Sequence, residues 1–432
     1  MPINTIRAWA SMKIAMIHTP ILGRGGGERQ ILRLATELQR KGNEVEIFVS
    51  ALDVENSYPD MLRNLNVTVI PHPLGKKMPR LLTPLEPVRS PKSGQEGSRQ
   101  ESAIRQWMRK NMGRQFYTIP YELPTMINIG RKIPKGFDVI NNHNYPSEWA
   151  AFIAKKRLKR PVVWMCNEPP FWFFVPALRR GLRRINWPVY NLLDKTAVNY
   201  IDEILVLSNV AGGYVTKAYN RSSKVVRSGI DAQRFRKASG NKVRVRYGLE
   251  KDFVLLQVGN IELNKRQADA VKALQILSKR YNGIKLVFDG GGRQDELVWW
   301  CEKLGVRDRV IFLRSSSDEE LAEVYAACDV FVFPANITWG LAVVEAMAAA
   351  KPVVVSNRCG ASEIIQTDVN GVVVNHARPE ELAKQVERLM NNPDLCRRLG
   401  ENAQRYVMSN LSWEKYSERM ESAFEKAVQG YS

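Results

Sequence analysis

The feature that most constrains the fold is a repeated alternation of short apolar segments with glycine-containing loops and amphipathic segments. Residues 13–20 form an apolar segment, residues 22–28 a glycine-rich loop, and residues 29–42 carry apolar side chains at helical spacing. Residues 44–50 then supply a second strand. This order predicts an α/β fold with a parallel sheet and helical crossovers. Later strands of the sheet are expected at residues 137–143, 161–167 and 203–208.

A second strand and helix series follows a polar stretch at residues 225–241, which contains Gly229 and Gly240 and suits a connection between domains. A chain of 432 residues also exceeds what one hydrophobic core usually serves. We therefore expect two Rossmann-like domains whose parallel sheets present the carboxyl ends of their strands to a central cleft. Strands of the second sheet are expected at residues 253–260, 284–292, 309–314, 329–334 and 352–357.

These patterns predict an N-terminal domain at residues 1–227, a C-terminal domain at residues 228–411, and a helix at residues 412–432 that packs back on the N-terminal domain. A basic segment at residues 76–124, which contains proline and serine, is expected to be an insertion that is partly helical near residues 101–112.

The formal net charge of +20 is uneven, because residues 1–208 hold 31 Lys and Arg against 17 Asp and Glu. Such a field attracts nucleic acid, anionic membrane or a phosphorylated substrate, and charge alone does not choose among them. The five cysteines are widely spaced and contain no CxxC pair, so the sequence predicts neither a disulfide framework nor a zinc site. A cytoplasmic location is expected. No apolar run approaches the roughly 18 residues that span a bilayer, so any membrane association is expected to be peripheral.

The segment at residues 331–356 carries the clearest chemical signal. A strand ends at Pro334, the chain turns at Gly340, and a helix is expected from Leu341, with Ala342 and Glu345 in its first turns. The amino end of a helix binds phosphate through backbone N–H groups and the helix dipole. Glu345 would accept hydrogen bonds from sugar or ribose hydroxyls there. The alternative is a glutamate that merely complements the helix dipole.

Three further residues follow predicted strands at the edge where ligands of parallel sheets bind. Lys265 and Arg266 come after the strand at residues 253–260 and would neutralise a diphosphate, although a solvated loop lysine fits the pattern equally well. His143 ends the strand at residues 137–143 within a polar run. It is a candidate for the reaction site, with a structural histidine as the alternative.

Taken in order, these motifs resemble those of the retaining glycosyltransferases of family 4, which have the GT-B fold. The similarity extends through nearly the whole chain, and the joint order of the motifs is more specific than any one of them. The matching residues are Gly25, Gly26, Gly27, His143, Gly229, Ile230, Asp231, Phe235, Gly259, Lys265, Gly290, Gly292, Gly340, Glu345, Gly360, Glu363 and Gly371.

The resemblance implies a role for each matched position. Glu345 would bind ribose hydroxyls. Lys265 and Arg266 would together neutralise the donor diphosphate. His143 would lie near the reacting sugar. The phosphates would be held by backbone groups of Gly340, Leu341 and Ala342 and, in the opposite domain, by those of Gly26 and Gly27. Gly259, a further donor-side residue, belongs to the first loop of the C-terminal domain.

Two positions depart from the family pattern. Ile337 stands where the family usually has a second glutamate that holds hydroxyls of the donor sugar, and Asn260 stands where an arginine is common. The sugar would then be held by backbone groups or Thr338, the sugar or acceptor type would differ, or activity would be lost. No D-x-D triplet occurs, so we expect neither a metal nor any other cofactor besides the nucleotide sugar.

The implied reaction transfers a hexose-type sugar, such as mannose or glucose, from a UDP- or GDP-linked donor to an acceptor hydroxyl with retention. The acceptor is expected to be a lipid-linked or cell-surface glycan that meets the basic N-terminal domain. Aromatic and arginine side chains at residues 169–188 suit contact with anionic lipid, and a buried aromatic cluster beside a solvated helix is the alternative. The residues assigned to this acceptor or membrane side are His18, Trp172, Phe173, Arg179 and Arg180.

Other functional classes explain less of the sequence. A dinucleotide-dependent oxidoreductase would need G-x-G-x-x-G after the first strand, but Glu28 occupies the position of the last glycine. A sugar-nucleotide epimerase would share the architecture and bind the same donor without an acceptor. A non-catalytic, glycosyltransferase-like binding subunit would accommodate Ile337. No nucleic-acid-binding module is recognisable, so a nucleic-acid partner is not expected.

Overall fold

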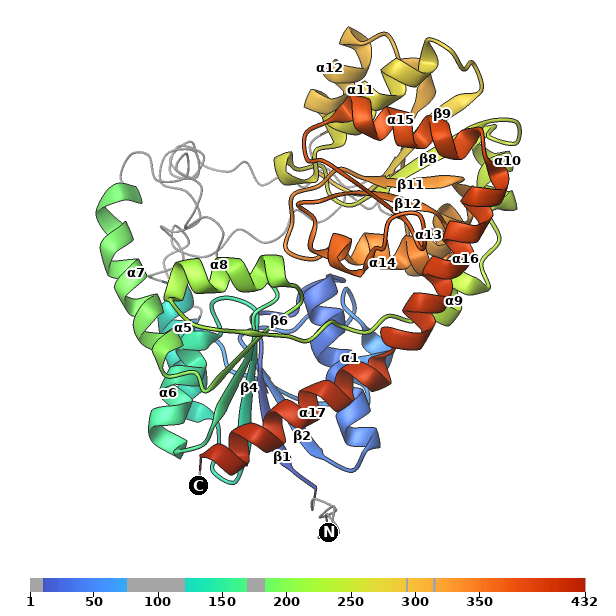
Figure 1. Ribbon diagram of the computed structural model, residues 1–432. Coiled ribbons are helices and arrows are strands. Elements are labelled where there is room, and N and C mark those ends of the chain that lie inside the picture. Colours follow the sequence, from blue (N-terminus) through green and yellow to red (C-terminus); the bar gives the residue numbers. More distant parts are fainter. Residues whose placement is uncertain (1–10, 76–120, 169–182, 293, 314–315, 432) are drawn as a thin grey trace, which may run out of the picture. The chain divides into compact units, whose positions relative to one another are not determined.

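The computed structural model describes residues 11–75, 121–168, 183–292, 294–313 and 316–431. The chain divides into two compact units, each built on its own parallel sheet (Figure 1). The N-terminal unit comprises Met1–Val206, Gly213–Lys224 and Ser417–Ser432, and the C-terminal unit comprises Leu207–Gly212 and Val225–Tyr416. The sequence led us to expect boundaries after residues 227 and 411; the units of the structure differ mainly in that Leu207–Gly212 belongs to the C-terminal unit.

The N-terminal unit contains a seven-stranded sheet in the order β3-β2-β1-β4-β5-β6-β7, with parallel pairing from β3 to β6. Its strands are β1 (Lys13–Ile17), β2 (Glu44–Val49), β3 (Asn66–Val69), β4 (Val139–His143), β5 (Val162–Met165), β6 (Glu203–Val206) and β7 (Lys224–Val225). Its helices are α1 (Gly26–Arg40), α2 (Pro59–Leu62), α5 (Leu123–Lys132), α6 (Glu148–Leu158), α7 (Arg183–Asn199), most of α8 (Asn209–Tyr219) and most of α17 (Trp413–Gly430).

The C-terminal unit contains a six-stranded parallel sheet in the order β10-β9-β8-β11-β12-β13. The strands are β8 (Phe253–Val258), β9 (Ile284–Asp289), β10 (Val310–Leu313), β11 (Val330–Phe333), β12 (Val353–Ser356) and β13 (Val372–Val374). The helices are α9 (Ala232–Arg236), α10 (Asn241–Tyr247), α11 (Gln267–Ser278), α12 (Asp295–Lys303), α13 (Asp318–Ala327), α14 (Leu341–Ala348), α15 (Pro379–Met390) and α16 (Pro393–Asn410), with short 3-10 turns at Leu263–Lys265, Arg307–Arg309 and Gly360–Ile364.

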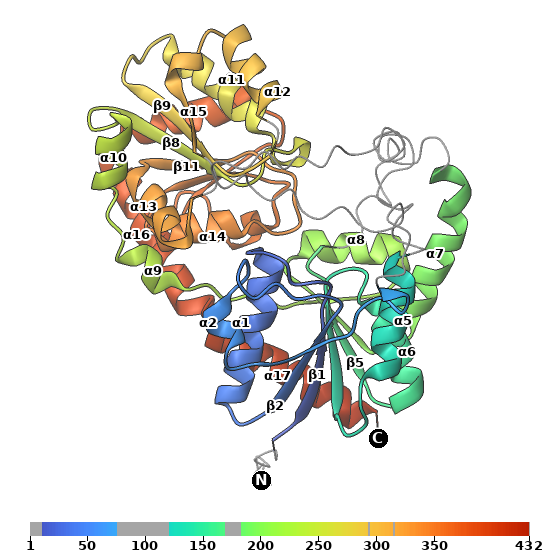
Figure 2. The same cartoon turned by 180° about the vertical axis from the view of Figure 1, so that it is seen from behind.

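Two helical layers sandwich the sheet of the C-terminal unit. Helices α11, α12 and α15 pack on one face through a continuous apolar core, to which Leu395 and Leu399 of α16 also belong, and α13 and α14 cover the other (Figures 1 and 2). On the second face the ring of Tyr325 in α13 lies 5.7 Å from that of Phe331 in β11. Burial of both faces explains why these strands are continuous apolar runs rather than alternating ones. The predicted α/β class with two parallel, Rossmann-like sheets is confirmed.

Helix α17 begins in the C-terminal unit and continues, from Ser417 onward, as part of the N-terminal unit. Its Glu421 accepts hydrogen bonds from the Asn43 side-chain amide at 2.7 Å and from Lys41 Nζ at 3.1 Å. These contacts fix the helix to the turn between α1 and β2.

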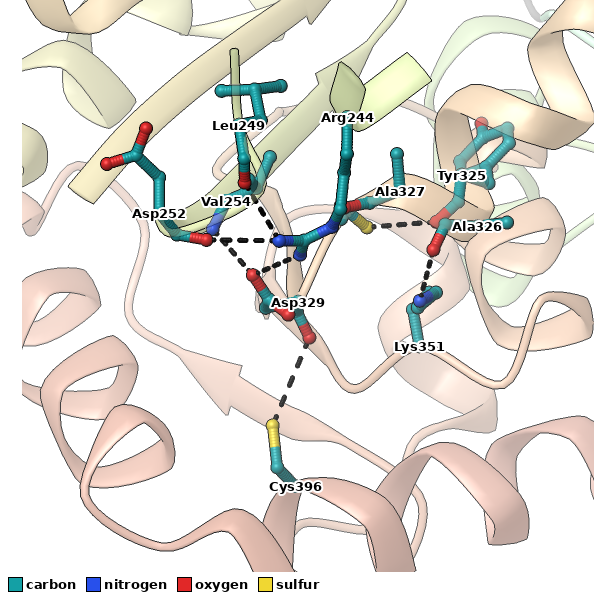
Figure 3. A network of polar contacts seen from close by, with 11 residues as sticks. Arg244, Leu249, Asp252, Val254, Tyr325, Ala326, Ala327, Asp329, Lys351 and Cys396 are labelled. Atoms are coloured by element: carbon teal, nitrogen blue, oxygen red, sulfur yellow. Dashed lines mark hydrogen bonds and ion pairs between the residues drawn. The ribbon is translucent and has the colours of Figure 1, made fainter. Parts of the chain in front are cut away.

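A polar network joins the amino ends of β8 and β11 in the C-terminal unit (Figure 3). Arg244 of α10 donates to Asp329 Oδ2 at 2.7 Å and to the carbonyl oxygens of Leu249 and Ala327. The same Asp329 oxygen accepts the Val254 N–H at 2.7 Å. A single guanidinium therefore satisfies carbonyl groups of the segments that lead into β8 and β11.

Replacing Arg244 with alanine is expected to lower the free energy of unfolding by roughly 2–3 kcal/mol, because half-buried carbonyls and Asp329 lose a charged donor. Urea denaturation measures this loss. Arg246→Ala is the matched control, since Arg246 is an exposed residue of the same helix. Equal stability of the two variants would contradict the structural role.

Two sequence predictions concern residues that the structure does not describe. The insertion expected at residues 76–124 lies outside the described residues except for its last four, and Trp172, Phe173, Arg179 and Arg180 lie outside them altogether. Within the described part of the chain, no helix combines the length and apolarity needed to cross a bilayer.

Candidate functional site

The C-terminal unit brings four predicted site residues to the carboxyl ends of the neighbouring strands β8 and β11. Gly259 and Lys265 follow β8, while Gly340 and Glu345 follow β11, and the two strands pair directly. The chain runs outward from β8 through β9 to β10 and then returns to β11 on the other side of β8. Ligands of open parallel sheets bind at such a switch point.

Helix α14 begins at this switch point. Its N-cap, Gly340, has a φ of +119°, which side chains rarely permit, and a Cβ there would lie 2.8 Å from Cys359 Sγ. Leu341 and Ala342 form the first helical positions, whose backbone N–H groups have no acceptor within a helix. The local geometry is therefore that of an anion-binding helix terminus.

Glu345 lies one turn into α14 and is only 5% exposed. Its Oε2 accepts a hydrogen bond from the Tyr325 hydroxyl at 2.9 Å. Burial and the neighbouring Glu345 raise the pKa of Tyr325 well above its ordinary value, so the phenol stays a proton donor. Tyr325 thus orients the carboxylate. The sequence interpretation missed it, because the sequence of α13 gives no local signal for a hydroxyl that bonds a residue 20 positions away.

The two basic residues after β8 differ in their surroundings. Lys265 Nζ lies 5.7 Å from the centroid of the Phe333 ring at the end of β11, and its aliphatic stem passes beside Gly259. Arg266 instead forms an ion pair with Asp269, with 2.5 Å between Nε and Oδ2. Lys265 is therefore directed toward β11, while the guanidinium of Arg266 is bound within its own turn. A phosphate-binding role for either residue stays a prediction.

The loop that contains Ile337 is fixed through its backbone. The Gly360 N–H donates to Ile337 O at 2.9 Å, the Ala361 N–H donates to Trp339 O at 2.8 Å, and the Ser208 hydroxyl donates to Thr338 O. The side chain of Ile337 is half-buried. The position of the missing family glutamate is therefore well ordered and apolar.

In the N-terminal unit, His18 and His143 both lie at the carboxyl edge of the sheet, after β1 and at the end of β4. Both side chains are buried. His143 Nε2 lies 2.7 Å from Asn141 Oδ1, and burial holds its pKa well below the ordinary value. His18 accepts from the Asn144 amide at 2.9 Å and donates through Nδ1 to Thr19 O, and burial also lowers its pKa. Both imidazoles are neutral at pH 7.

Asn144 connects the predicted glycines to the histidines. Gly26 and Gly27 lie in the first turn of α1, not in a loop as expected, and a Cβ on Gly27 would lie 2.5 Å from the Asn144 amide nitrogen. Asn167 donates to Asn144 Oδ1 at 2.7 Å and to Gln30 Oε1. The sequence placed a polar run after β4 but singled out only His143. Asn144 has a left-handed backbone conformation, with φ of +59°, which asparagine adopts more readily than most residues. An asparagine directly after the strand is therefore the sequence feature that could have indicated this turn.

No group of three or more His, Cys, Asp or Glu side chains suited to a metal ion occurs in the part of the chain that the structure describes.

Known proteins match the chain along most of its length. Residues 90–234 match the family described as Glycosyltransferase Family 4, and residues 241–406 match Glycosyl transferases group 1. The putative glycosyltransferase EpsD of Bacillus subtilis (strain 168) is 28% identical over 63% of this chain and 72% of its own length. The D-inositol 3-phosphate glycosyltransferase of Rhodococcus erythropolis (strain PR4 / NBRC 100887) is 27% identical, over 55% of each chain.

A solved structure of Anabaena HepE in complex with UDP and glucose superposes with a TM-score of 0.71 at 18% identity, covering 96% of this chain and 100% of the other. At this identity the likeness supports the fold, which is that of a GT-B glycosyltransferase. Two family matches in sequence order, on the two sheets described above, lead to one conclusion: the chain belongs to the group 1, family 4 glycosyltransferases of GT-B fold.

Proposed function

We propose that the protein transfers a hexose-type sugar from a nucleoside diphosphate to an acceptor hydroxyl with retention of anomeric configuration. The observation that carries this proposal is the Tyr325–Glu345 pair beside the start of α14 at the β8–β11 switch point. A carboxylate that is already oriented accepts ribose hydroxyls at little entropic cost. The helix terminus and Lys265 supply positive potential for the leaving diphosphate.

The relatives support a sugar nucleotide as donor. HepE has been solved with UDP and glucose and with UDP-glucose, and one matched relative is a D-inositol 3-phosphate glycosyltransferase. We propose a UDP- or GDP-linked hexose as donor, and a lipid-linked or cell-surface glycan as acceptor. The diphosphate would leave without a bridging metal, its charge neutralised by Lys265 and the α14 terminus.

A non-catalytic, donor-binding subunit is the second candidate, and Ile337 is the observation that favours it. An apolar side chain at this ordered position removes a hydrogen-bond acceptor for the sugar. A transfer assay decides between the candidates: an enzyme releases nucleoside diphosphate only together with a glycosylated product, whereas a binding subunit is stabilised by the donor without turnover. Conversion of the donor sugar without an acceptor would instead indicate an epimerase.

The donor site is tested by replacing Glu345 with alanine. Because a buried, charged hydrogen-bond acceptor is lost, the affinity for the nucleotide sugar is expected to fall about ten- to 100-fold. Nucleotide sugars are first screened for thermal stabilisation of the unmodified protein, since a ligand that binds only the folded state raises the melting temperature. Calorimetry with the best ligand then compares Glu345→Ala with Glu319→Ala, an exposed glutamate of α13. Equal affinities would overturn the assignment of Glu345.

A further inference from the structure

The carboxylate of Asp289 is incompletely satisfied. Asp289 is the last residue of β9, and its side chain is only 2% exposed. Its Oδ1 accepts the Ser316 N–H at 3.1 Å, and the Ser316 side chain also interacts with the carboxylate, whereas Oδ2 itself has no hydrogen bond among the described residues. Burial raises the pKa of Asp289 above its ordinary value. An unmatched oxygen in a buried carboxylate is costly unless a donor completes it.

Strand register places Asp289 on the same face of the sheet as the donor-site pair. In parallel sheets, directly paired residues point to the same face. Asp289 pairs with Val258, two residues beyond Leu256, which pairs with Phe331. Phe331 contacts Tyr325, and Asp289 is, after Glu345, one of the charges that raise the pKa of Tyr325. Asp289 therefore faces the same helical layer as Tyr325 and Glu345.

Topology indicates which part of a donor would reach Asp289. If the diphosphate lies at the start of α14, between β8 and β11, the nucleoside extends along the sheet in one of two directions. Toward β9 and β10 it meets Asp289 at the carboxyl end of the second strand of the unit. In doubly wound folds a carboxylate near this position bonds a ribose hydroxyl.

We infer that Asp289 is a nucleoside contact of the donor site: Oδ2 accepts a hydrogen bond from a ribose O–H or a base N–H, while Oδ1 holds the segment that begins at Ser316. This inference rests on the proposed function. It adds a specificity-determining residue at a position that the sequence interpretation did not single out, because an aspartate before three glycines resembles an ordinary strand end.

The test measures binding of UDP, GDP and inorganic pyrophosphate by calorimetry. Asp289→Asn keeps an oxygen for the Ser316 N–H but replaces the acceptor at Oδ2 with a donor. Nucleotide affinity is expected to fall about ten-fold or more, whereas pyrophosphate affinity stays unchanged. Asp295→Asn is the control, because it removes the same charge from an exposed position in α12.

Deoxy and N-methylated forms of the tighter nucleotide test the contact on the unmodified protein and do not depend on the folding of a variant. Loss of affinity with the 2′- or 3′-deoxy form identifies a ribose contact, either of Glu345 or of Asp289, and loss with N3-methyl-UDP or N1-methyl-GDP identifies a base contact. The analogue that loses affinity with the unmodified protein should lose none with Asp289→Asn.

Two results would overturn the inference while leaving the proposed function intact: nucleotide binding by Asp289→Asn equal to that of Asp295→Asn, and a parallel loss of nucleotide and pyrophosphate affinity. Analogues that all bind as tightly as the parent nucleotide would overturn the inference together with the ribose contact proposed for Glu345. Failure of the unmodified protein to bind UDP, GDP or any nucleotide sugar would overturn the proposed function, and this inference with it.

Discussion

Alanine at position 360 is expected to destabilise the C-terminal unit by about 3 kcal/mol or more and to abolish donor binding. A Cβ on Gly360 would lie 1.9 Å from Thr338 O and 2.7 Å from Ser208 Oγ, far inside contact distance. Neither neighbour can simply rotate away, because the Gly360 N–H bonds Ile337 O in the same loop. The loop must therefore shift, and it leads directly into Gly340 and the start of α14.

Thermal melting and calorimetry with a nucleotide sugar measure the two effects. Gly283→Ala provides the control within the same unit: the nearest atoms to its added Cβ would be 3.6 Å away, which is ordinary contact. If Gly360→Ala has the same melting temperature and the same ligand affinity as Gly283→Ala, the loop accommodates a Cβ and the prediction is contradicted.

The stability of the N-terminal unit is expected to fall as pH rises from about 4 to above 6, because of a buried pair of carboxyl groups. Glu148 of α6 and Asp194 of α7 are both fully buried and interact electrostatically, and the Tyr219 hydroxyl of α8 donates to Asp194 Oδ2 at 2.6 Å. Burial raises the pKa of Asp194 to about 6, and burial together with Asp194 raises that of Glu148 well above its ordinary value. Burial also raises the pKa values of the adjacent Cys166 and Tyr219, so both stay neutral.

The sign follows from proton binding in the two states. Unfolded carboxyl groups release their protons near pH 4, whereas the folded pair retains them to higher pH, so the folded state binds more protons in this interval. The stabilisation is therefore complete below the unfolded pKa values and is lost as pH rises through the folded ones. For a shift of about two units the loss is roughly 3 kcal/mol.

Glu148→Gln is the informative variant, since its amide is neutral like the protonated acid and removes one of the two buried charges. It should be about as stable as the unmodified protein at pH 4 and more stable at pH 8. Urea denaturation across this range measures the difference, with Glu203→Gln as a control for a carboxylate that forms a surface ion pair with Lys224. If the difference in stability between Glu148→Gln and the unmodified protein stays constant from pH 4 to pH 8, the predicted pH dependence is contradicted.

The sequence predicted the α/β class and most strands of both sheets, because parallel strands buried on both faces are apolar runs that composition alone reveals. It missed β3, β7 and β13, which are short, with only four, two and three residues. It also began α1 too late: Gly26 and Gly27 are weak helix formers, yet Asn144 approaches so closely that larger side chains would not fit.

The sequence predicted those residues of the candidate site that lie within one local motif. Gly340 and Glu345 share a single helix entrance, so their spacing is visible in the sequence. Tyr325, Asp289 and Asn144 were not predicted, because their roles depend on partners in other elements, brought close only by strand order and register. Strand order depends on how all strands of the sheet pair, and the sequence of a single segment does not indicate it.

The Arg244–Asp329 network has a consequence for how such a protein diversifies. The network links β8 and β11 at their amino ends, whereas the candidate ligand contacts of the C-terminal unit follow the carboxyl ends of its strands. Insertions and substitutions in the carboxyl-side loops therefore do not alter the hydrogen bonds of this network. The residues that would contact a donor or acceptor can therefore vary while this network at the opposite ends of the strands stays the same.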